Sequence, residues 1–207
     1  MGYRPDPVDS GVQHAMKILV ACEFSGVVRD AFNKRGHEAL SCDLLPTDVP
    51  GWHYQGDVFD IINYGWDMMI AHPPCTYLSN AGVRWLYEKE NRWCDLIDGA
   101  VFFRKLLNAP IDRICVENPV MHKWANKIIN IDYAQMIQPW QFGHGETKAT
   151  CLWLKGLREL QPTDIVDERE HRIHKMPPGP DRWKLRSTTY QGIADAMAEQ
   201  WGSNALN

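Results

Sequence analysis

The sequence lacks any hydrophobic run long enough to cross a membrane. Apolar stretches such as residues 100–103 fall far short of the roughly 18 residues that a membrane-spanning helix needs. The N-terminal segment of residues 1–11 is polar and contains Pro5 and Pro7, a composition unlike that of a secretory signal peptide. We therefore expect a cytoplasmic protein with no membrane partner.

Paired cysteines and a strong net charge are also missing. The 6 cysteines form no C-x-x-C pair, so neither a zinc site nor a disulfide framework is indicated. With 22 Lys and Arg against 26 Asp and Glu, the net charge of -4 argues against binding nucleic acid by bulk charge. A local basic segment at 171–186 is typical of either a solvated loop or a phosphate-binding surface.

The 207 residues suffice for one domain with a hydrophobic core, and 44% of them are hydrophobic. Residues 1–15 show no periodicity, so we expect a flexible leader followed by a single domain over 16–207. Buried strands are predicted at 16–22, 38–42, 67–71, 111–116 and 150–154. Helical patterns lie between several of these runs, which predicts an α/β protein with a mostly parallel, doubly wound sheet.

Three segments carry clear helical signals. One apolar helical face begins at Val27 and ends before Gly36, and a longer one over 96–107 stops before Pro110. Thr188 and Gln191 match the pattern of a capping box, which predicts a final helix over 192–201.

The residues that directly follow the predicted strands are unusual for a core sequence. Ligands of doubly wound sheets bind beyond the carboxyl ends of the strands, so these positions are candidates for function. They are Glu23-Phe24-Ser25-Gly26, Asp43, His72-Pro73-Pro74-Cys75 and Glu117-Asn118-Pro119. A cysteine on a double-proline turn, with a carboxylic acid at the end of a neighbouring strand, suits nucleophilic attack on an activated ring.

These segments together resemble the signature motifs of the cytosine-5 DNA methyltransferases. The matching residues are Phe24-Ser25-Gly26, Pro73-Pro74-Cys75 and Glu117-Asn118-Pro119. The resemblance covers most of residues 16–202 and is to a minimal, free-standing, phage-type form without a separate target-recognition domain. It implies a Rossmann-like, S-adenosylmethionine-dependent methyltransferase fold.

The resemblance implies four catalytic residues. Cys75 would add to carbon 6 of cytosine, and Glu117 would protonate nitrogen 3, a general-acid role that calls for a raised pKa. Asn118 would orient the acid or the sugar, and holding the turn before Pro119 is an equally open role. Lys148 would be the one cation that remains of the family's Gln-x-Arg-x-Arg strand.

S-adenosylmethionine is the methyl donor that the resemblance implies. Phe24 would stack on its adenine, and Asp43 would bind its ribose. The other implied contacts are Ser25, Gly26, Asp57, Val58 and Pro74. Val27 and Val28 stand where the family has glycines, so the cofactor loop must be shaped differently.

DNA is the substrate that the resemblance implies, with RNA or a free nucleotide left open. The nucleic-acid contacts would be His72 and Ser79 beside Cys75, with Arg182, Lys184 and Arg186 on phosphates. Too few residues separate the last predicted strand from the final helix for a recognition domain, so a protein partner is expected to help select the target. Methylation of an exocyclic amine, and a catalytically silent accessory protein that binds nucleic acid or cofactor, are the remaining alternatives.

Overall fold

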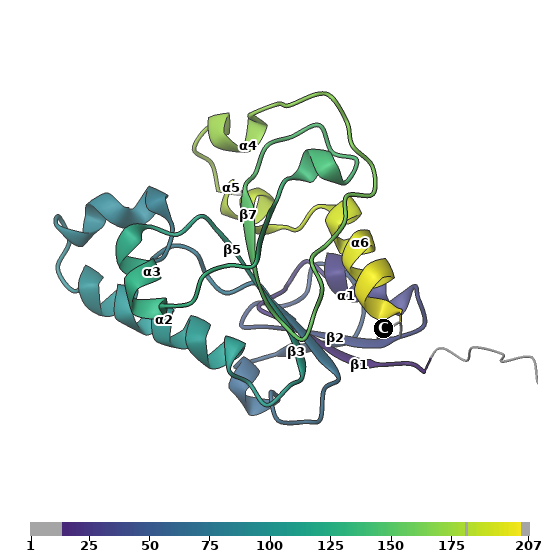
Figure 1. Ribbon diagram of the computed structural model, residues 1–207. Coiled ribbons are helices and arrows are strands. Elements are labelled where there is room, and N and C mark those ends of the chain that lie inside the picture. Colours follow the sequence, from purple (N-terminus) through teal and green to yellow (C-terminus); the bar gives the residue numbers. More distant parts are fainter. Residues whose placement is uncertain (1–13, 181, 204–207) are drawn as a thin grey trace, which may run out of the picture.

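Helices cover both faces of a central sheet in the computed structural model, which describes residues 14–180 and 182–203 (Figure 1). The leader expected over 1–15 falls almost entirely outside the described residues, as do residues 204–207 of the expected domain. Within the described part of the chain, no helix combines the length and apolar character needed to cross a membrane.

Seven strands form one sheet in the order β3-β2-β1-β4-β5-β7-β6. In chain order they are β1 (Lys17–Ala21), β2 (Glu38–Asp43), β3 (His53–Gln55), β4 (Met68–Ala71), β5 (Arg113–Pro119), β6 (Gln135–Ile137) and β7 (Thr150–Lys155). β7 runs antiparallel to β5 and β6, and the other neighbouring pairs are parallel. The predicted α/β class, with its mostly parallel, doubly wound sheet, is confirmed.

The central strands divide their side chains between two cores. Ile18 and Val20 of β1 face α1 (Val27–Asn33) and α6 (Gln191–Gly202), whereas Leu19 and Ala21 face α2 (Arg92–Leu107) and α3 (Lys123–Ile129). Successive side chains of a strand point to opposite faces, so a strand buried on both faces must be apolar throughout. Figure 1 shows α1 and α6 on one side of the sheet and α2 and α3 on the other.

The remaining helical elements are short and lie in the connections. They are α4 (Arg172–Lys175), α5 (Arg182–Ser187) and the 3-10 helices η1 (Val58–Asp60), η2 (Asn80–Leu86) and η3 (Pro139–Gln141).

Some boundaries differ from the sequence prediction. β3 and β6 were not expected, and β5 begins later and ends later than the predicted 111–116. The predicted capping box is wrong: the residue that caps α6 is Tyr190, and it makes no side-chain capping hydrogen bond. The Thr188 hydroxyl instead donates to the backbone oxygen of Lys184 at 2.9 Å, in the last turn of α5.

The two ends of the described fold meet at His37, at the edge where the parallel strands begin. The Met16 N–H donates to Nδ1 of His37 at 3.3 Å. At the far end of the chain, a Cβ atom on Gly202 would lie 2.6 Å from Nε2 of the same ring. Figure 1 shows the C-terminal end close to the start of β1.

Candidate active site

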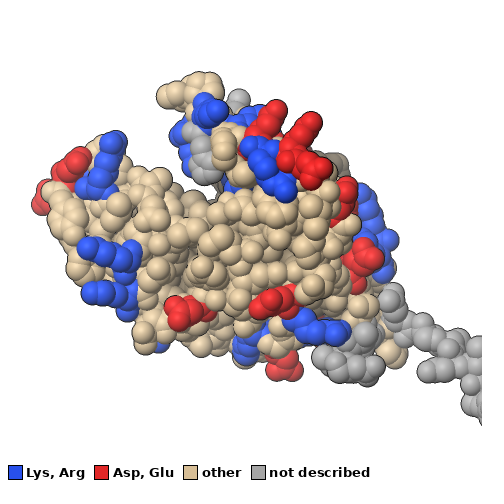
Figure 2. All heavy atoms as spheres, turned by 45° about the horizontal axis from the view of Figure 1, so that its top comes forward, with Lys and Arg blue, Asp and Glu red and all other residues tan. Residues whose placement is uncertain are grey.

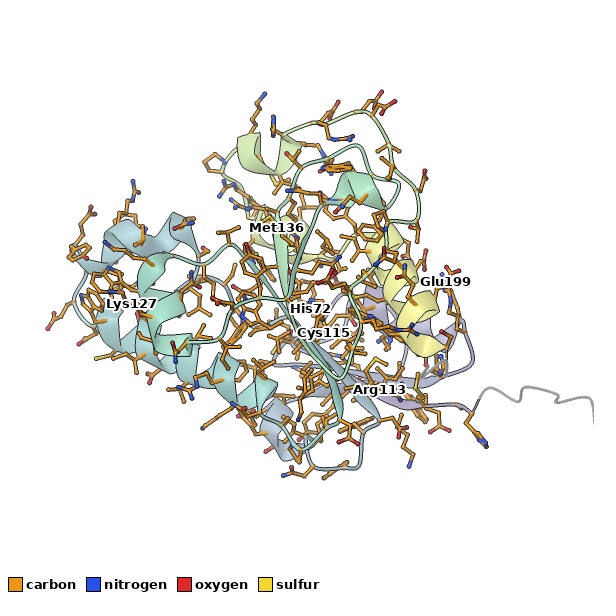
Figure 3. The ribbon with its side chains drawn as sticks, in the orientation of Figure 1. His72, Arg113, Cys115, Lys127, Met136 and Glu199 are labelled. Atoms are coloured by element: carbon orange, nitrogen blue, oxygen red, sulfur yellow. The ribbon has the colours of Figure 1, made fainter. Side chains whose placement is uncertain are left out.

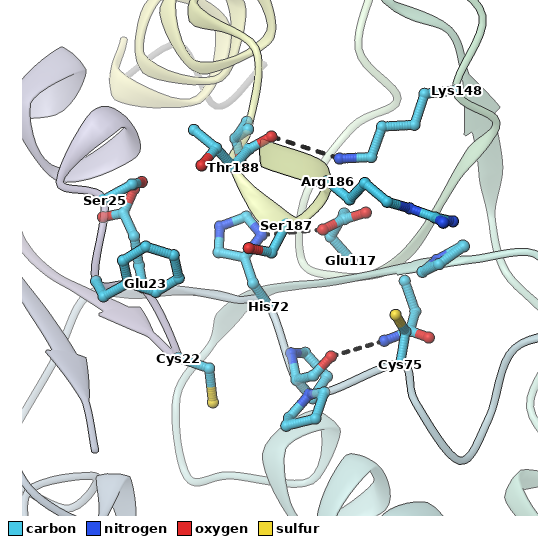
Figure 4. A pocket seen from close by; sticks show the side chains of 16 residues that line it. Cys22, Glu23, Ser25, His72, Cys75, Glu117, Lys148, Arg186, Ser187 and Thr188 are labelled. Carbon is cyan, nitrogen blue, oxygen red and sulfur yellow. Dashed lines mark hydrogen bonds and ion pairs between the residues drawn. The ribbon is translucent and has the colours of Figure 1, made fainter. Parts of the chain in front are cut away.

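A pocket lies at the carboxyl ends of β1, β4 and β5 (Figure 4). The strand order reverses between β1 and β4, so the pocket is at the switch point where such sheets bind ligands. Lys148, just before β7, and the segment between α5 and α6 close its other side. The lining residues are Cys22, Glu23, Phe24, Ser25, His72, Pro73, Pro74, Cys75, Glu117, Asn118, Pro119, Lys148, Arg186, Ser187, Thr188 and Thr189.

Hydrogen bonds from two directions hold the turn that carries Cys75. β5 continues beyond its last residue paired with β4, which places Asn118 beside the turn. Asn118 Nδ2 donates to the backbone oxygen of Pro73 at 2.9 Å. The N–H groups of Leu78 and Ser79 donate to the Cys75 oxygen at 3.1 and 2.9 Å. Asn118 therefore fixes the turn, and Ser79 is not among the lining residues.

Opposing influences act on the Cys75 thiol. Burial, followed by the Glu117 carboxylate, raises its pKa above the ordinary value. The charges of Lys148 and Arg186 act in the opposite direction and offset this only in part. Cys75 is therefore a thiol in the free protein at neutral pH, and these two cations favour its thiolate.

Glu117 forms an ion pair with His72 across neighbouring strands. Ala71 of β4 is in register with Val116 of β5, so the two residues that follow lie side by side, and His72 Nδ1 is 3.1 Å from Glu117 Oε2. Burial alone would raise the pKa of Glu117, but the hydrogen bond and charge of His72, with Lys148, lower it below its ordinary value. The expected raised pKa of Glu117 is thus not found, because the sequence does not show that His72 pairs with it.

Two buried polar atoms of the lining have no hydrogen-bond partner among the described residues. They are Nε2 of His72 and Oδ1 of Asn118. Each belongs to a side chain whose other polar atom is already held, by Glu117 and by Pro73 respectively. Buried polar atoms are nearly always paired in folded proteins, so unpaired ones beside a pocket are groups that a ligand or water would satisfy.

The turn between β1 and α1 is built without the glycines of the related motif. The Glu23 carboxylate accepts hydrogen bonds from the N–H groups of Val28 and Arg29, at 2.7 and 3.2 Å, and so caps α1. Gly26 has a φ of +75°, and a Cβ there would lie 2.5 Å from the Arg29 guanidinium. The fully buried Arg29 in turn donates to Ser41 at 3.2 Å and to the loop that follows β2.

Sequence reasoning missed Arg29 as part of this turn. Arginine is rarely buried unless it is paired. Arg29 Nε pairs with Asp30 Oδ1 at 2.7 Å, and its other partners come from β2 and from the loop that follows β2. Its sequence signal is the adjacent pair of charged residues between the apolar positions of the first helix.

The residues assigned to the cofactor fall into two groups. Phe24, Ser25 and Pro74 line the pocket, whereas Gly26, Asp43, Asp57 and Val58 do not. Cys22 connects the groups, because it lines the pocket and its pKa is raised by burial and then by the charges of Asp43 and Asp57. Asp43 and Asp57 are therefore close enough to act on Cys22, although they do not line the pocket themselves.

Part of the basic segment, the helix α5, packs against Phe24 at one end of the pocket. Trp183 of α5 packs against Phe24 with 5.5 Å between ring centroids. Lys184 Nζ is 2.6 Å from Asp48 Oδ1, and Arg182 Nε donates to the Met176 oxygen at 2.9 Å. Of the three basic residues assigned to nucleic acid, Arg186 alone is among the lining residues.

A hydrogen-bond network around Glu146, beside the part of the pocket that Lys148 lines, was not predicted. The Tyr190 hydroxyl donates to Glu146 Oε2 at 2.6 Å, and Arg172 of α4 pairs with the other oxygen of the same carboxylate. Lys148, two residues after Glu146, donates to the Thr188 oxygen at 3.4 Å and lies over the Tyr190 ring. The network therefore places Lys148 next to the segment that lines the pocket.

The residues present fit S-adenosylmethionine. An aromatic ring, hydroxyls, carboxylates and an unpartnered imidazole nitrogen surround one end of the pocket, and these groups suit an adenine, a ribose and an amino acid. Among the described residues there is no cluster of His, Cys, Asp and Glu that could hold a metal ion.

The surface around the pocket is hollowed. Figure 2 shows the hollow between a raised part that carries α2 and α3 and another that carries α4 and α5, with Lys and Arg side chains on both. Figure 3 shows His72 deep in the central part of the molecule, whereas Lys127 and Glu199 lie near its outline.

Comparison with known proteins found similar structures but no match at the level of sequence families. No protein-family model matches the sequence, and no curated protein matches it. The methyltransferase EhMeth of Entamoeba histolytica aligns with a TM-score of 0.46 and 11% identity, over 80% of this chain and 61% of that one. The Dnmt2 methyltransferase of S. pombe aligns at 0.44 and 13%, over 77% and 53%. A DNMT2 variant of Spodoptera frugiperda aligns at 0.38 and 18%, over 76% and 55%. The chain thus spans 53 to 61% of the length of these proteins.

Proposed function

We propose that this protein transfers a methyl group from S-adenosylmethionine to carbon 5 of cytosine in DNA. The observation that carries the proposal is the pocket in which Cys75, Glu117 and Lys148 face the turn between β1 and α1. A nucleophile, an acid and a cofactor turn meet at the point of the sheet where ligands bind.

Carbon 5 of cytosine is too weak a nucleophile to accept a methyl group unaided. In the proposed reaction the Cys75 thiol loses its proton to solvent and the thiolate forms a bond to carbon 6. The electron pair of the 5,6 double bond moves through the ring, and nitrogen 3 takes a proton from Glu117. The resulting enamine is nucleophilic at carbon 5.

The second half of the reaction restores the ring. When bound, S-adenosylmethionine would supply the methyl group that carbon 5 attacks, and S-adenosylhomocysteine would be the leaving group. The proton on carbon 5 then leaves to solvent, the 5,6 double bond re-forms, and the bond between Cys75 Sγ and carbon 6 breaks. The Cys75 thiolate takes a proton from solvent and nitrogen 3 returns its proton to Glu117, so both residues end as they began.

Lys148 and Arg186 have a specific task in this scheme. The pKa of Cys75 is raised, so the thiolate is scarce, and the two cations partly offset the burial and the Glu117 charge that cause this. A bound phosphate would compete for Arg186, which leaves Lys148 as the more constant support of the thiolate.

The cofactor would occupy the end of the pocket formed by Phe24, Ser25 and Pro74. Asp43 would accept from the ribose hydroxyls, with Gly26, Asp57 and Val58 close to the nucleoside. The nucleic acid would approach from the hollow, with His72 and Ser79 near the base and Arg182, Lys184 and Arg186 near phosphates. A protein partner would supply most of the sequence selection.

Incubation with tritiated S-adenosylmethionine and separate DNA, RNA and dCMP substrates tests the proposal. We expect tritium in 5-methylcytosine of DNA, and no such label with Cys75→Ala. Label in RNA or in dCMP would move the substrate, and label on the exocyclic amine would overturn the mechanism. A protein that binds nucleic acid or cofactor without transferring label would be the silent accessory protein.

A substrate that contains 5-fluorocytosine gives a second readout of the same step. Fluorine at carbon 5 blocks the final elimination, so a covalent adduct at Cys75 should accumulate when the methyl donor is present. Mass mapping of the modified peptide identifies the cysteine, and an adduct at any of the other five would contradict the assignment.

A further inference from the structure

The proposed reaction requires Glu117 to donate a proton, and the ionised carboxylate has none to give. Nitrogen 3 must receive a proton as charge develops in the ring. In the free protein, however, the hydrogen bond and charge of His72 keep the pKa of Glu117 low, so near neutral pH this carboxyl is ionised. An acid that is ionised before the substrate arrives needs a source of protons.

His72 is placed to be that source. Its side chain is 9% exposed, and its Nδ1 lies 3.1 Å from Glu117 Oε2. The backbone fixes the pair, because the residues preceding each are in register between β4 and β5, and the His72 N–H donates to the Ala21 oxygen at 2.9 Å. The contact is thus anchored to three neighbouring strands rather than to mobile loops.

The second nitrogen of the same ring has no partner. His72 Nε2 is buried and unpaired among the described residues, while His72 itself lines the pocket. A histidine with one nitrogen on a carboxylate and the other unpaired beside a pocket can pass a proton to the carboxylate and take one from a group that binds there.

We infer that His72 and Glu117 share one proton, which Glu117 gives to nitrogen 3 of the cytosine and His72 restores to Glu117. This inference rests on the proposed function. His72 is then a positioning residue, because it acts on the substrate through Glu117. The related motif itself assigns no residue to this task, and the sequence resemblance placed His72 only near the base.

The protons balance over the cycle. Before reaction the pair is an imidazolium and a carboxylate, which together hold one proton at the Nδ1–Oε2 contact. As Cys75 adds to carbon 6, the proton passes from Nδ1 through Glu117 to nitrogen 3, and the pair becomes a neutral imidazole and a carboxylate. When the thiolate leaves after methyl transfer, nitrogen 3 returns the proton by the same route.

Other charged groups face the pair from two sides. Glu23, just after β1, faces His72, and burial raises the pKa of its carboxyl. Lys148, before β7, favours the ionised forms of Glu117 and Cys75, and Arg186, in α5, favours that of Cys75.

Replacement of His72 by asparagine separates proton supply from structure. The asparagine amide nitrogen occupies the place of Nδ1 and can still donate to Glu117, but it carries no exchangeable charge. The measurement is the single-turnover rate of methyl transfer over about pH 6 to pH 8, where each unit changes the thiolate fraction by about tenfold. It uses whichever nucleic acid the labelling experiment identifies.

In His72→Asn the acid is Glu117 alone, so each pH unit that gains thiolate loses about as much protonated Glu117. The variant should therefore be slower, and its pH profile should be nearly flat. In the wild type the pair supplies the proton, so the shape of its profile should differ from that of the variant. Imidazole added to His72→Ala should restore the wild-type shape.

The controls separate this inference from the proposed function. His72→Asn should melt at the wild-type temperature and bind S-adenosylmethionine with wild-type affinity in calorimetry, and His14→Gln should leave the pH profile unchanged. A His72→Asn profile parallel to that of the wild type, at any absolute rate, overturns the inference and leaves the function standing. A wild-type protein that forms no 5-methylcytosine overturns both.

Discussion

Cys75 lies between charges of opposite sign, and the balance between them sets how much thiolate it presents. Glu117 and burial favour the thiol, and Lys148 and Arg186 favour the thiolate. Cys94 is the most exposed cysteine but has neither cation, and Cys42, Cys115 and Cys151 are buried. Reactivity at Cys75 is thus a property of its neighbours more than of its exposure.

Removal of the Lys148 charge should make Cys75 less reactive. In Lys148→Gln the pKa of Cys75 should rise further, because a cation that favours the thiolate is lost. At pH 7.5 alkylation by iodoacetamide follows the thiolate fraction, so it should slow by roughly threefold or more. Peptide mapping by mass spectrometry reports Cys75 separately from the other cysteines.

Lys34→Gln is the matched control for this measurement, since Lys34 is an exposed lysine just after α1. Its alkylation rate at Cys75 should equal that of the wild type. Equal rates in Lys148→Gln and wild type would show that Lys148 does not act on the thiol.

At the scale of elements, the turn from β1 into α1 contains two left-handed residues, Cys22 and Gly26, and is held by one buried charge. Gly26 adopts a φ of +75°, and Arg29 fills the space beside it while it binds Ser41 and the oxygen of Pro50. The arginine thereby ties α1 to β2 and to the loop that follows β2.

Gly26→Ala should destabilise the protein by about 1 to 3 kcal/mol. The added methyl group would lie 2.5 Å from a guanidinium that is itself fixed by hydrogen bonds, and the backbone angle disfavours any side chain. Urea unfolding followed by circular dichroism measures the change. Gly179→Ala is the control, because a Cβ there meets nothing within 4 Å, and a variant as stable as this control would contradict the account.

Asp43, the last residue of β2, leads to a separate prediction about cofactor binding. Asp43→Ala should weaken S-adenosylmethionine binding by about 1 to 3 kcal/mol, since a charge-assisted hydrogen bond to the ribose is lost. Isothermal calorimetry measures the affinity. Asp112→Ala removes an exposed acid just before β5, at the end of the sheet where the parallel strands begin, and should bind as the wild type does. Equal loss in both variants would point to net charge instead.

At the scale of the whole molecule, the basic residues proposed to bind phosphates differ in whether they are already paired within the chain. Lys184 is already paired with Asp48, whereas Arg186 faces the pocket. The triple change of Arg182, Lys184 and Arg186 to Gln should therefore cost about two phosphate contacts rather than three. Each lost contact lowers the slope of log affinity against log salt by about 0.9 on duplex DNA.

Fluorescence anisotropy with a labelled duplex at several salt concentrations measures that slope. The control changes Lys17, Lys34 and Arg35 to Gln, which removes the same charge at the edge of the sheet where the strands begin. A slope equal to that of the wild type in the first variant, or an equal loss in both, would place the nucleic acid elsewhere.

The sequence predicts the central strands and three of the helices that cover them, α1, α2 and α6, because a parallel sheet buried on both faces needs long apolar runs. It does not predict α3. β3 and β6 are three residues long and lie at the two edges, so they leave too short a pattern to detect. The strand-end residues of the pocket were found for the same reason, as their places follow from the strands. The pairing of His72 with Glu117 and the burial of Arg29 were not, since both depend on register and on loops brought together by the fold.

The meeting of both described ends at His37 bears on how further parts could be joined to this protein. Met16 and Gly202 lie where the strands begin, and the pocket lies where they end. A module attached next to Met16 or Gly202 would therefore be on the side of the sheet away from Cys75. A tether that brings a sequence-reading module to the pocket must accordingly be long enough to pass from one side of the sheet to the other.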